Sequence, residues 1–188
     1  MKQEMFSIYY HKYSVNNWQE KKSEIKEWLN KRTLVRRDTG LIQFYTDRFS
    51  ETSDEDKFNF CQIIREELNM FSKEIETNQL IVQDIWSVQY TKGDFHAPHD
   101  HGSCNYSLVL YVDYDEQEHT PTQFVCPYKD ATKNVTFISA DNSTKEGDIV
   151  IFPSNILHLT LPNKSDKIRT VVSMDIVTVG TQHPHNKH

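Results

Sequence analysis

Two histidines, His99 and His101, are separated by a single residue at the entry to a segment of strand-like composition. On an extended chain alternate side chains share a face, so both imidazoles are expected to point the same way while Asp100 points the other way. Two ring nitrogens on one face can hold adjacent coordination positions of a metal ion. The pair therefore predicts part of a metal site.

A third histidine, His158, follows the run from Glu146 to Pro153, which is typical of a turn that leads into a buried strand. In a jelly roll such a strand can return beside the first one and supply a third ligand. Three imidazoles suit iron, copper, nickel or zinc, so the ligand type alone does not choose the metal. His96 is out of phase with the pair, and His11 and His119 have no partners, so these three are assigned structural roles.

An arginine lies in the last apolar run, where strand alternation places Arg169 and Ser173 on one face. A guanidinium buried inside a barrel needs an anion, and its fork of donors matches a carboxylate. Tyr111 and Ser107 share a face of an earlier run and can offer hydroxyl groups to the same anion. The alternative for Arg169 is an ordinary surface salt bridge.

The elements that position these residues begin with two predicted helices. The first runs from Asn16, which can form a capping box with Gln19, to about Lys31, and the second runs from Thr52, paired with Glu55, to Ile75. The apolar residues of the first helix fall on one side, and those of the second recur at spacings of three and four, so the second stripe is expected to pack against a sheet. The stripes are Trp18, Ile25, Trp28 and Leu29, and then Phe58, Cys61, Ile64, Leu68, Phe71 and Ile75.

From about residue 80 the pattern changes to short β-rich runs separated by polar turns. The predicted strands are Leu80 to Thr91, Ser107 to Asp113, Thr122 to Pro127, Asn134 to Ala140, Asp148 to Pro153, His158 to Leu161 and Ile168 to Val179. Strands with no helical pattern between them cannot form a parallel α/β sheet. We therefore expect a mainly β fold with N-terminal helices: a double-stranded β-helix, that is a cupin-like jelly-roll barrel, braced by two helices.

Length and composition are those of one folded domain. The 188 residues predict a single domain, with a helical bracing region at 1–79, a jelly-roll core at 80–179 and a flexible, histidine-rich tail at 180–188. The net charge of −6 and the absence of a run of Lys or Arg make nucleic acid an unlikely partner. No apolar run approaches the roughly 20 residues that span a bilayer, so no membrane partner is expected. With no signal-peptide pattern and three widely spaced cysteines, the sequence predicts a cytoplasmic protein and leaves its oligomeric state open.

The same residues carry a family resemblance. The stretch from Tyr90 to His101 resembles the Tyr-x-x-Gly-x-x-x-x-x-His-x-Asp segment of prolyl-hydroxylase-like 2-oxoglutarate/iron(II) oxygenases. The stretch from Gly147 to His158 and the Arg-x-x-x-Ser of Arg169 to Ser173 look like the distal histidine and the cosubstrate arginine of that superfamily. The resemblance covers roughly residues 84 to 176 and is closest to small phage and bacterial oxygenases that carry His-x-His.

The resemblance implies a role for each candidate residue. His99, His101 and His158 would bind iron(II), Arg169 and Tyr111 would bind the far carboxylate of 2-oxoglutarate, and Ser107 or Ser173 would assist. Dioxygen would be the oxidant. The three histidines, called the triad below, and Arg169 are therefore the candidate catalytic residues that the resemblance implies. The sequence departs from the family at His101, where most of the superfamily has a carboxylate. Replacing that anion with a neutral imidazole leaves the iron site one charge more positive.

The implied activity is oxidative decarboxylation of 2-oxoglutarate coupled to hydroxylation of a C–H bond. On resemblance alone, a prolyl side chain in a peptide or protein is the first candidate substrate, and a small molecule is the other. The spacings also resemble those of cupins, although the glutamate that cupins often place after His-x-His is missing between Ser107 and Tyr111. A three-histidine cupin dioxygenase, or a metal-binding cupin module that does not use 2-oxoglutarate, is the alternative.

Overall fold

The computed structural model describes residues 8–102, 104–129 and 136–180, and gives no side chains for 129 and 136–140. Strands predominate in these ranges, and the helices all precede residue 75. In chain order the elements are β1 His11–Ser14, α1 Trp18–Asn30, β2 Val35–Asp38, β3 Ile42–Thr46, α2 Asp54–Ile63, α3 Arg65–Glu74, β4 Gln79–Tyr90, β5 Phe95–His99, β6 Tyr106–Asp113, β7 Gln123–Lys129, β8 Thr136–Ala140, β9 Asp148–Pro153, β10 His158–Thr160 and β11 Arg169–Val179.

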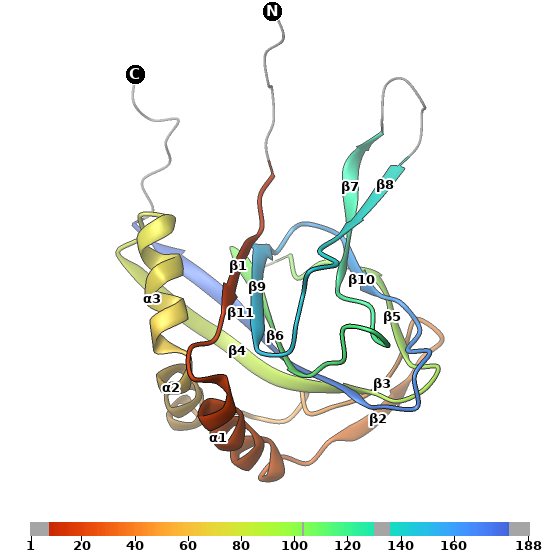
Figure 1. The fold of residues 1–188 in the computed structure, drawn as a ribbon. Coiled ribbons are helices and arrows are strands. Elements are labelled where there is room, and N and C mark those ends of the chain that lie inside the picture. Colours follow the sequence, from red (N-terminus) through yellow and green to blue (C-terminus); the bar gives the residue numbers. More distant parts are fainter. Residues whose placement is uncertain (1–7, 103, 130–135, 181–188) are drawn as a thin grey trace, which may run out of the picture.

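The strands form one antiparallel sheet that curls into a half-barrel (Figure 1). Its order is β1-β9-β6-β11-β4-β3-β5-β10-β7-β8, with β2 added beside β3. Strand β3 connects the strands that run from β1 to β4 in this order with the strands that run from β5 to β8. It pairs with β4 through Tyr45 and Thr46, and with β5 through Ile42 and Gln43. The predicted fold class, a mainly β jelly-roll barrel with N-terminal helices, is confirmed.

Alternation along the central strands separates two cores. On β11 the even positions Val172, Met174 and Ile176 belong to the cluster under the helices, whereas Val171 belongs to the cluster inside the barrel. Strands β4, β6 and β9 follow the same rule. A strand buried on both faces needs apolar residues at every position, so a polar side chain on the interior face stands out. Arg169, Ser173 and Asp175 occupy that interior phase of β11.

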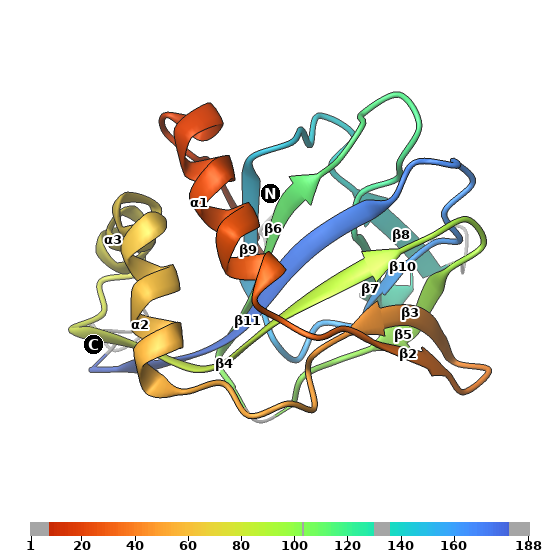
Figure 2. The ribbon, with the colours of Figure 1, turned by 90° about the horizontal axis from the view of Figure 1, so that it is seen from below.

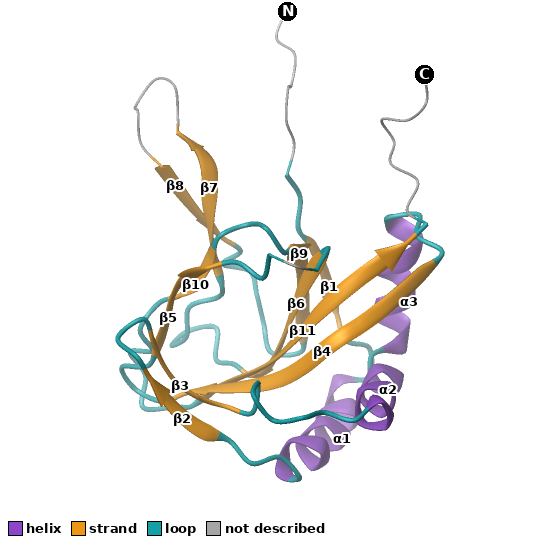
Figure 3. Ribbon diagram, turned by 180° about the vertical axis from the view of Figure 1, so that it is seen from behind, coloured by secondary structure: helices purple, strands orange, loops and turns teal. Residues whose placement is uncertain are grey.

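The helices pack on the outer face of the β11–β4 pair (Figure 2), and Figure 3 shows the same arrangement from behind. The two-helix prediction is wrong, since the second helix breaks at Ile64, whose backbone has φ −109° and ψ 25°. Phe58 of the predicted stripe is 63% exposed, whereas Phe60, Ile64 and Phe71 are fully buried. In the part of the chain that the structure describes, the helices are too short and polar to span a membrane.

The predicted helix caps are replaced by neighbouring residues. Ser53, and not Thr52, caps α2 by accepting a hydrogen bond from the Asp56 N–H at 3.1 Å. Asn17 precedes α1 in the left-handed region, with φ 54°, and makes no side-chain cap. The capping box predicted for Asn16 is therefore wrong, and its backbone N–H instead donates to the buried Glu67 carboxylate at 2.9 Å.

Residues 1–79 are more than a helical brace, because β1, β2 and β3 come from this region and pair into the sheet. These strands are short, and β1 and β2 carry mostly charged or polar residues, while β3 alternates only at Ile42 and Phe44, which is too short a run to mark a strand. Strand β5, which holds His99, escaped prediction for the same reason and contains Pro98. The predicted tail beyond Gly180 and the first two residues of the strand predicted from Asn134 lie outside the described residues.

Candidate metal centre

The three histidines selected from the sequence come together inside the half-barrel. Each of His99, His101 and His158 offers one ligand nitrogen, and these nitrogens lie within 4.8 Å of one another. Backbone pairing explains why two of them are close: His158 on β10 lies directly opposite His99 on β5, so their side chains share a face. The third, His101, lies two residues beyond His99, where its backbone N–H donates to the Ser154 carbonyl at 2.9 Å.

Hydrogen bonds fix the same tautomer in all three rings. The Nδ1 atoms of His99 and His158 lie 2.9 and 3.0 Å from the Ala97 and Ile156 carbonyl oxygens. His101 Nδ1 lies 2.6 Å from a carboxylate oxygen of Asp175. Carbonyl and carboxylate oxygens accept, so each Nδ1 carries the proton and each Nε2 carries the lone pair that binds a metal.

Burial keeps two of these imidazoles neutral at neutral pH. Desolvation, together with a smaller contribution from the neighbouring histidines, lowers the pKa of His99 to about 4 and that of His158 to about 3. A metal ligand must be the neutral imidazole, because the protonated ring has no lone pair to give. The cluster is therefore ready to accept a divalent cation at neutral pH, and the donor set fits iron(II).

Arg169 lies in the lining of the same cavity as the three histidines. Its side chain is 2% exposed, and its guanidinium lies over the rings of Tyr90 and Tyr111 at 5.2 and 5.5 Å. Nη2 donates to Thr122 Oγ1 at 3.5 Å, whereas Nε and Nη1 are buried without a hydrogen-bond partner among the described residues. A buried guanidinium with two donors unsatisfied fits a carboxylate ligand.

The remaining sequence-predicted residues are placed differently. Ser173 lines the cavity with Arg169. Ser107 lies at the other end, with its Oγ 2.9 Å from His101 Nδ1 and 3.0 Å from Ser154 Oγ. The hydroxyl of Tyr111 donates to Thr122 Oγ1 at 3.0 Å and accepts from the Thr122 N–H at 2.9 Å. Ser107 and Tyr111 are thus in contact with site residues, and neither is part of the cavity lining.

Three residues that sequence reasoning missed also belong to this region. Thr122 contacts Arg169, Asp175 contacts His101, and Arg48 lies over the Trp86 ring at 4.1 Å within the cavity lining. Asp175 could have been found from the sequence, because strand alternation places it on the same face as Arg169 and Ser173. Thr122 and Arg48 lie in or beside loops, where no periodicity marks a side chain's direction.

The other described histidines have structural surroundings. His119 accepts from the Asp115 N–H through Nδ1 at 3.0 Å, and Nε2 lies 3.1 Å from the Lys167 carbonyl, so both ring nitrogens are engaged. His11 lies 3.1 Å from Glu74 Oε1. His96 is different, because it lines the cavity with its ring stacked on His99.

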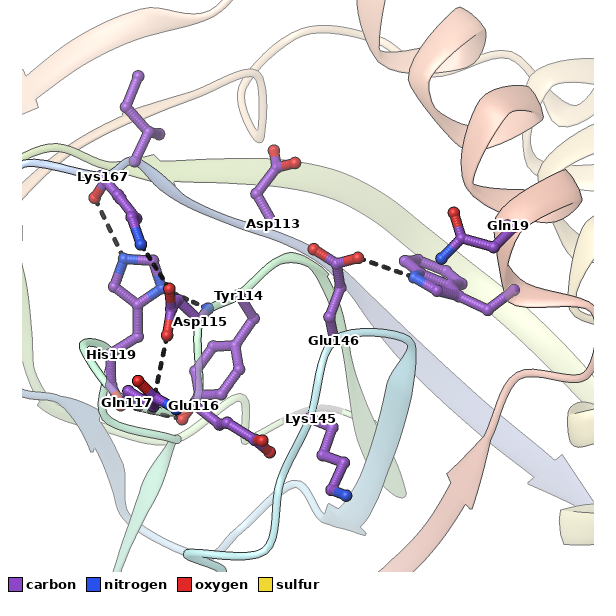
Figure 4. Close-up of a pocket in the computed structure, with 12 residues that line it drawn as sticks. Gln19, Asp113, Tyr114, Asp115, Glu116, Gln117, His119, Lys145, Glu146 and Lys167 are labelled. Carbon is purple, nitrogen blue, oxygen red and sulfur yellow. Dashed lines mark hydrogen bonds and ion pairs between the residues drawn. The ribbon is translucent and has the colours of Figure 1, made fainter.

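A second hollow, of about 790 Å³, lies between the start of α1, the loop after β6 and the turn before β9 (Figure 4). Several of its charged groups have partners: Lys167 lies 2.6 Å from Asp115, and Trp18 Nε1 donates to Glu146 at 3.0 Å. Among the described residues, its lining holds no buried polar atom without a hydrogen-bond partner and no cluster of metal-ligating side chains.

Fold and site together define a double-stranded β-helix with a histidine triad and a buried arginine in its interior. Residues 84–175 match the family model described as "Putative 2OG-Fe(II) oxygenase", just under half of the chain. This segment contains the triad and Arg169, and its match to the 2-oxoglutarate/iron(II) oxygenase model confirms the resemblance found in the sequence. No curated protein matches the chain significantly.

Solved structures share the fold at low sequence identity. A prolyl-4-hydroxylase from Pseudomonas putida is 11% identical with a TM-score of 0.62, covering 93% of this chain and 95% of its own. The viral collagen prolyl hydroxylase of Paramecium Bursaria Chlorella virus-1, in its 2OG complex, is 16% identical with a TM-score of 0.57, covering 89% and 95%. The α-ketoglutarate-dependent epimerase SnoN of nogalamycin biosynthesis is 12% identical with a TM-score of 0.69, covering 89% and 77%. Such identities establish the fold alone.

The cofactors follow from the family: iron(II) and 2-oxoglutarate, with dioxygen as the oxidant. The residues present fit this requirement on two independent observations. Three imidazoles present Nε2 lone pairs within one small region, and a buried guanidinium holds two donors without protein acceptors. Together they offer a place for a cation and a place for a carboxylate in one cavity.

Proposed function

We propose that this protein is an iron(II)- and 2-oxoglutarate-dependent dioxygenase that hydroxylates a C–H bond. The observation that carries the proposal is the joint lining of one cavity by three imidazoles and a buried, incompletely hydrogen-bonded arginine. Iron bound there supplies the chemistry in which dioxygen and 2-oxoglutarate give succinate, carbon dioxide and a substrate carrying one added oxygen atom.

In this proposal the chain's residues divide the work of binding. His99, His101 and His158 hold the cation through Nε2, while their Nδ1–H bonds fix the ring orientations. Arg169 binds the far carboxylate of 2-oxoglutarate, since its Nε and Nη1 donors point to no protein acceptor among the described residues.

The cavity walls contribute by excluding water. Trp86, Val88, Val109 and Val171 line the space between the histidines and Arg169. Apolar walls strengthen the attraction between Arg169 and a carboxylate, because less water competes for either charge. They also protect a reactive site from side reactions with solvent.

A prolyl residue in a peptide or protein is the substrate we propose to test first. Two solved structures that share the fold are prolyl hydroxylases, and a third is an epimerase of a biosynthetic pathway. The substrate panel should therefore hold proline-containing peptides and, as a second set, small molecules. Hydroxylation is scored by mass spectrometry as the gain of one oxygen atom together with one succinate.

The central experiment is an anaerobic titration of iron(II)-loaded protein with 2-oxoglutarate, followed by the visible charge-transfer band of the chelate. We expect the band in the wild type, no iron-dependent band in His101→Ala, and a saturation point shifted to higher 2-oxoglutarate in Arg169→Ala. A lost hydrogen bond to a charged group is worth about 1.5–3 kcal/mol, so the shift should be about 10- to 150-fold. The exposed Arg65 on α3 provides the matched control Arg65→Ala, which should titrate like the wild type.

The same titration separates the alternative. A cupin-type dioxygenase would turn over without 2-oxoglutarate and lose little on Arg169→Ala. A metal-binding module without catalysis would bind the ion, show no chelate band and release no succinate. Absence of the band in the wild type overturns the cosubstrate assignment.

A further inference from the structure

Asp175 is bonded to one of the three triad histidines. Its Oδ1 lies 2.6 Å from His101 Nδ1, and the two side chains are only 13% and 5% exposed. Its other oxygen lies 3.6 Å from Arg48 Nη2. The contrast with the other two rings is clear, because His99 and His158 are held by neutral backbone carbonyls.

The position of Asp175 in the sheet explains this contact. It lies in the same phase of β11 as Arg169 and Ser173, and its cross-strand neighbour on β6 is Ser107, whose hydroxyl also contacts His101 Nδ1. A register shift follows Asp175 in its pairing with β4. Irregularities of this kind are common beside active sites, where they redirect a side chain.

Placing a carboxylate here has a cost. On the β4 side the residue opposite Asp175 is Asp84, and the nearby Asp175 charge helps to raise the pKa of Asp84, after desolvation as the main cause. Like charges directly opposite each other destabilise a sheet. A largely buried carboxylate at this point needs a compensating contact. Among the described residues, the 2.6 Å bond to His101 is shorter than the 3.6 Å ion pair with Arg48.

We infer that Asp175 is a positioning residue for the metal site, and that through the His101 ring it supplies the negative charge that a carboxylate ligand would supply directly. This inference rests on the proposed function, since it requires His101 to bind the metal. A carboxylate that accepts from Nδ1–H fixes the ring's orientation and makes Nε2 a stronger donor. The His-x-His pattern then keeps an anion at the site, one hydrogen bond farther from the cation.

The test uses the full-length apo-protein and cobalt(II) as the probe, with affinity measured by competition against a chromophoric chelator. Asp175→Asn keeps an acceptor for Nδ1–H and removes only the charge, whereas Asp175→Ala removes both. We expect about 10- to 100-fold weaker binding in each, the range typical of a lost outer-shell partner. Asp84→Asn is the matched control: it removes the neighbouring carboxylate, which bonds the Ile85 N–H and not a histidine, and should leave affinity unchanged.

Two further readouts separate a positioning role from a structural one. At saturating cobalt, the visible absorption band should shift in Asp175→Asn and match the wild type in Asp84→Asn, and Asp175→Glu should recover part of the lost affinity. The second readout uses the variant His101→Asp, which places a carboxylate directly on the metal. In that background Asp175→Asn should weaken binding little or strengthen it, because the two anions repel each other.

The outcomes distinguish this inference from the proposed function. Cobalt binding in the wild type with unchanged affinity and band in Asp175→Asn overturns the role of Asp175 and leaves the metal site standing. An equal loss on Asp175→Asn in both backgrounds also overturns it, because the effect then does not pass through His101. If the wild type binds no cobalt, the proposed metal site fails and the inference fails with it.

Discussion

The imidazole rings of His96 and His99 lie stacked, with centroids 3.5 Å apart and planes inclined by 17°. His96 also meets the ring of Phe44 edge-on at 4.9 Å, and burial lowers its pKa to about 2. The nitrogens that converge as a possible ligand set are those of His99, His101 and His158. His96 therefore supports the site as a flat ring.

A ring without nitrogen should serve as well at this position. We predict that His96→Phe still binds one cobalt(II) per chain with affinity close to that of the wild type, because stacking on His99 is preserved. His99→Ala should lose more than about 100-fold, beyond the range of a lost outer partner. Isothermal titration of both variants gives the stoichiometry, and a loss in His96→Phe as large as in His99→Ala would make His96 a ligand.

Much of the candidate metal site could be predicted from the sequence, because a strand period of two assigns side chains to faces without further information. This logic selected Arg169 and Ser173, and it also covers Asp175. Alternation also predicted that His99 and His101 lie on one face, although His101 lies just outside β5. Pairing was not readable: nothing in the sequence states that β10 lies opposite β5, or that Ser107 faces Asp175 across β11 and β6.

The strands that were not predicted from the sequence share a physical feature. Strands β1, β2 and β3 draw their stability from the sheet that they join, and their own residues show little period of two. The break at Ile64 was missed for a different reason: every residue around it is compatible with a helix. The burial of Phe60 in place of Phe58 was likewise not marked by the periodicity of the sequence.

The network beside Arg169 yields a second prediction. Tyr111 exchanges two hydrogen bonds with Thr122, which in turn accepts from Arg169. Tyr111→Phe and Thr122→Val should each weaken 2-oxoglutarate binding by about 2- to 10-fold, the worth of a typical hydrogen bond. Because both act on one network, the double variant should lose little more than either single variant. The dissociation constants come from the chelate-band titration. A much larger effect of Tyr111→Phe alone would mean that its hydroxyl contacts the cosubstrate directly.

Gly147 is required by a close approach of the backbone to Trp18. Its φ is +84°, and a Cβ at this position would lie 2.7 Å from Trp18 Cδ2. We predict that Gly147→Ala lowers the free energy of unfolding by about 2–5 kcal/mol, from backbone strain and overpacking together. Gly93→Ala is the control, since its φ is +87° with nothing within 4 Å, and it should show the backbone cost alone. Urea unfolding measures both, and equal losses would contradict the role of Trp18.

The turn before β9 is tied to β1 by an ion pair whose strength depends on pH. Lys12 Nζ lies 2.9 Å from Asp141 Oδ2, and Ser143 donates to the same carboxylate through its backbone N–H and its hydroxyl. Burial alone would raise the pKa of Asp141, but the hydrogen bonds from Ser143 and Lys12 outweigh it and lower the pKa to about 2. An unfolded Asp titrates near 3.9, so between these values the unfolded chain binds more protons.

The contribution of Asp141 to stability should therefore be complete above about pH 5 and disappear as the pH falls toward 2. We predict that Asp141→Asn lowers the free energy of unfolding by about 1 kcal/mol at pH 7, as for a partly exposed pair. The difference from the wild type should shrink steadily below pH 4. Asp166→Asn is the control, because the Asp166 side chain is 88% exposed in its pair with Lys92. Urea unfolding at several pH values measures the difference, and a constant gap down to pH 2.5 would show that the charge of Asp141 is not what stabilises the turn.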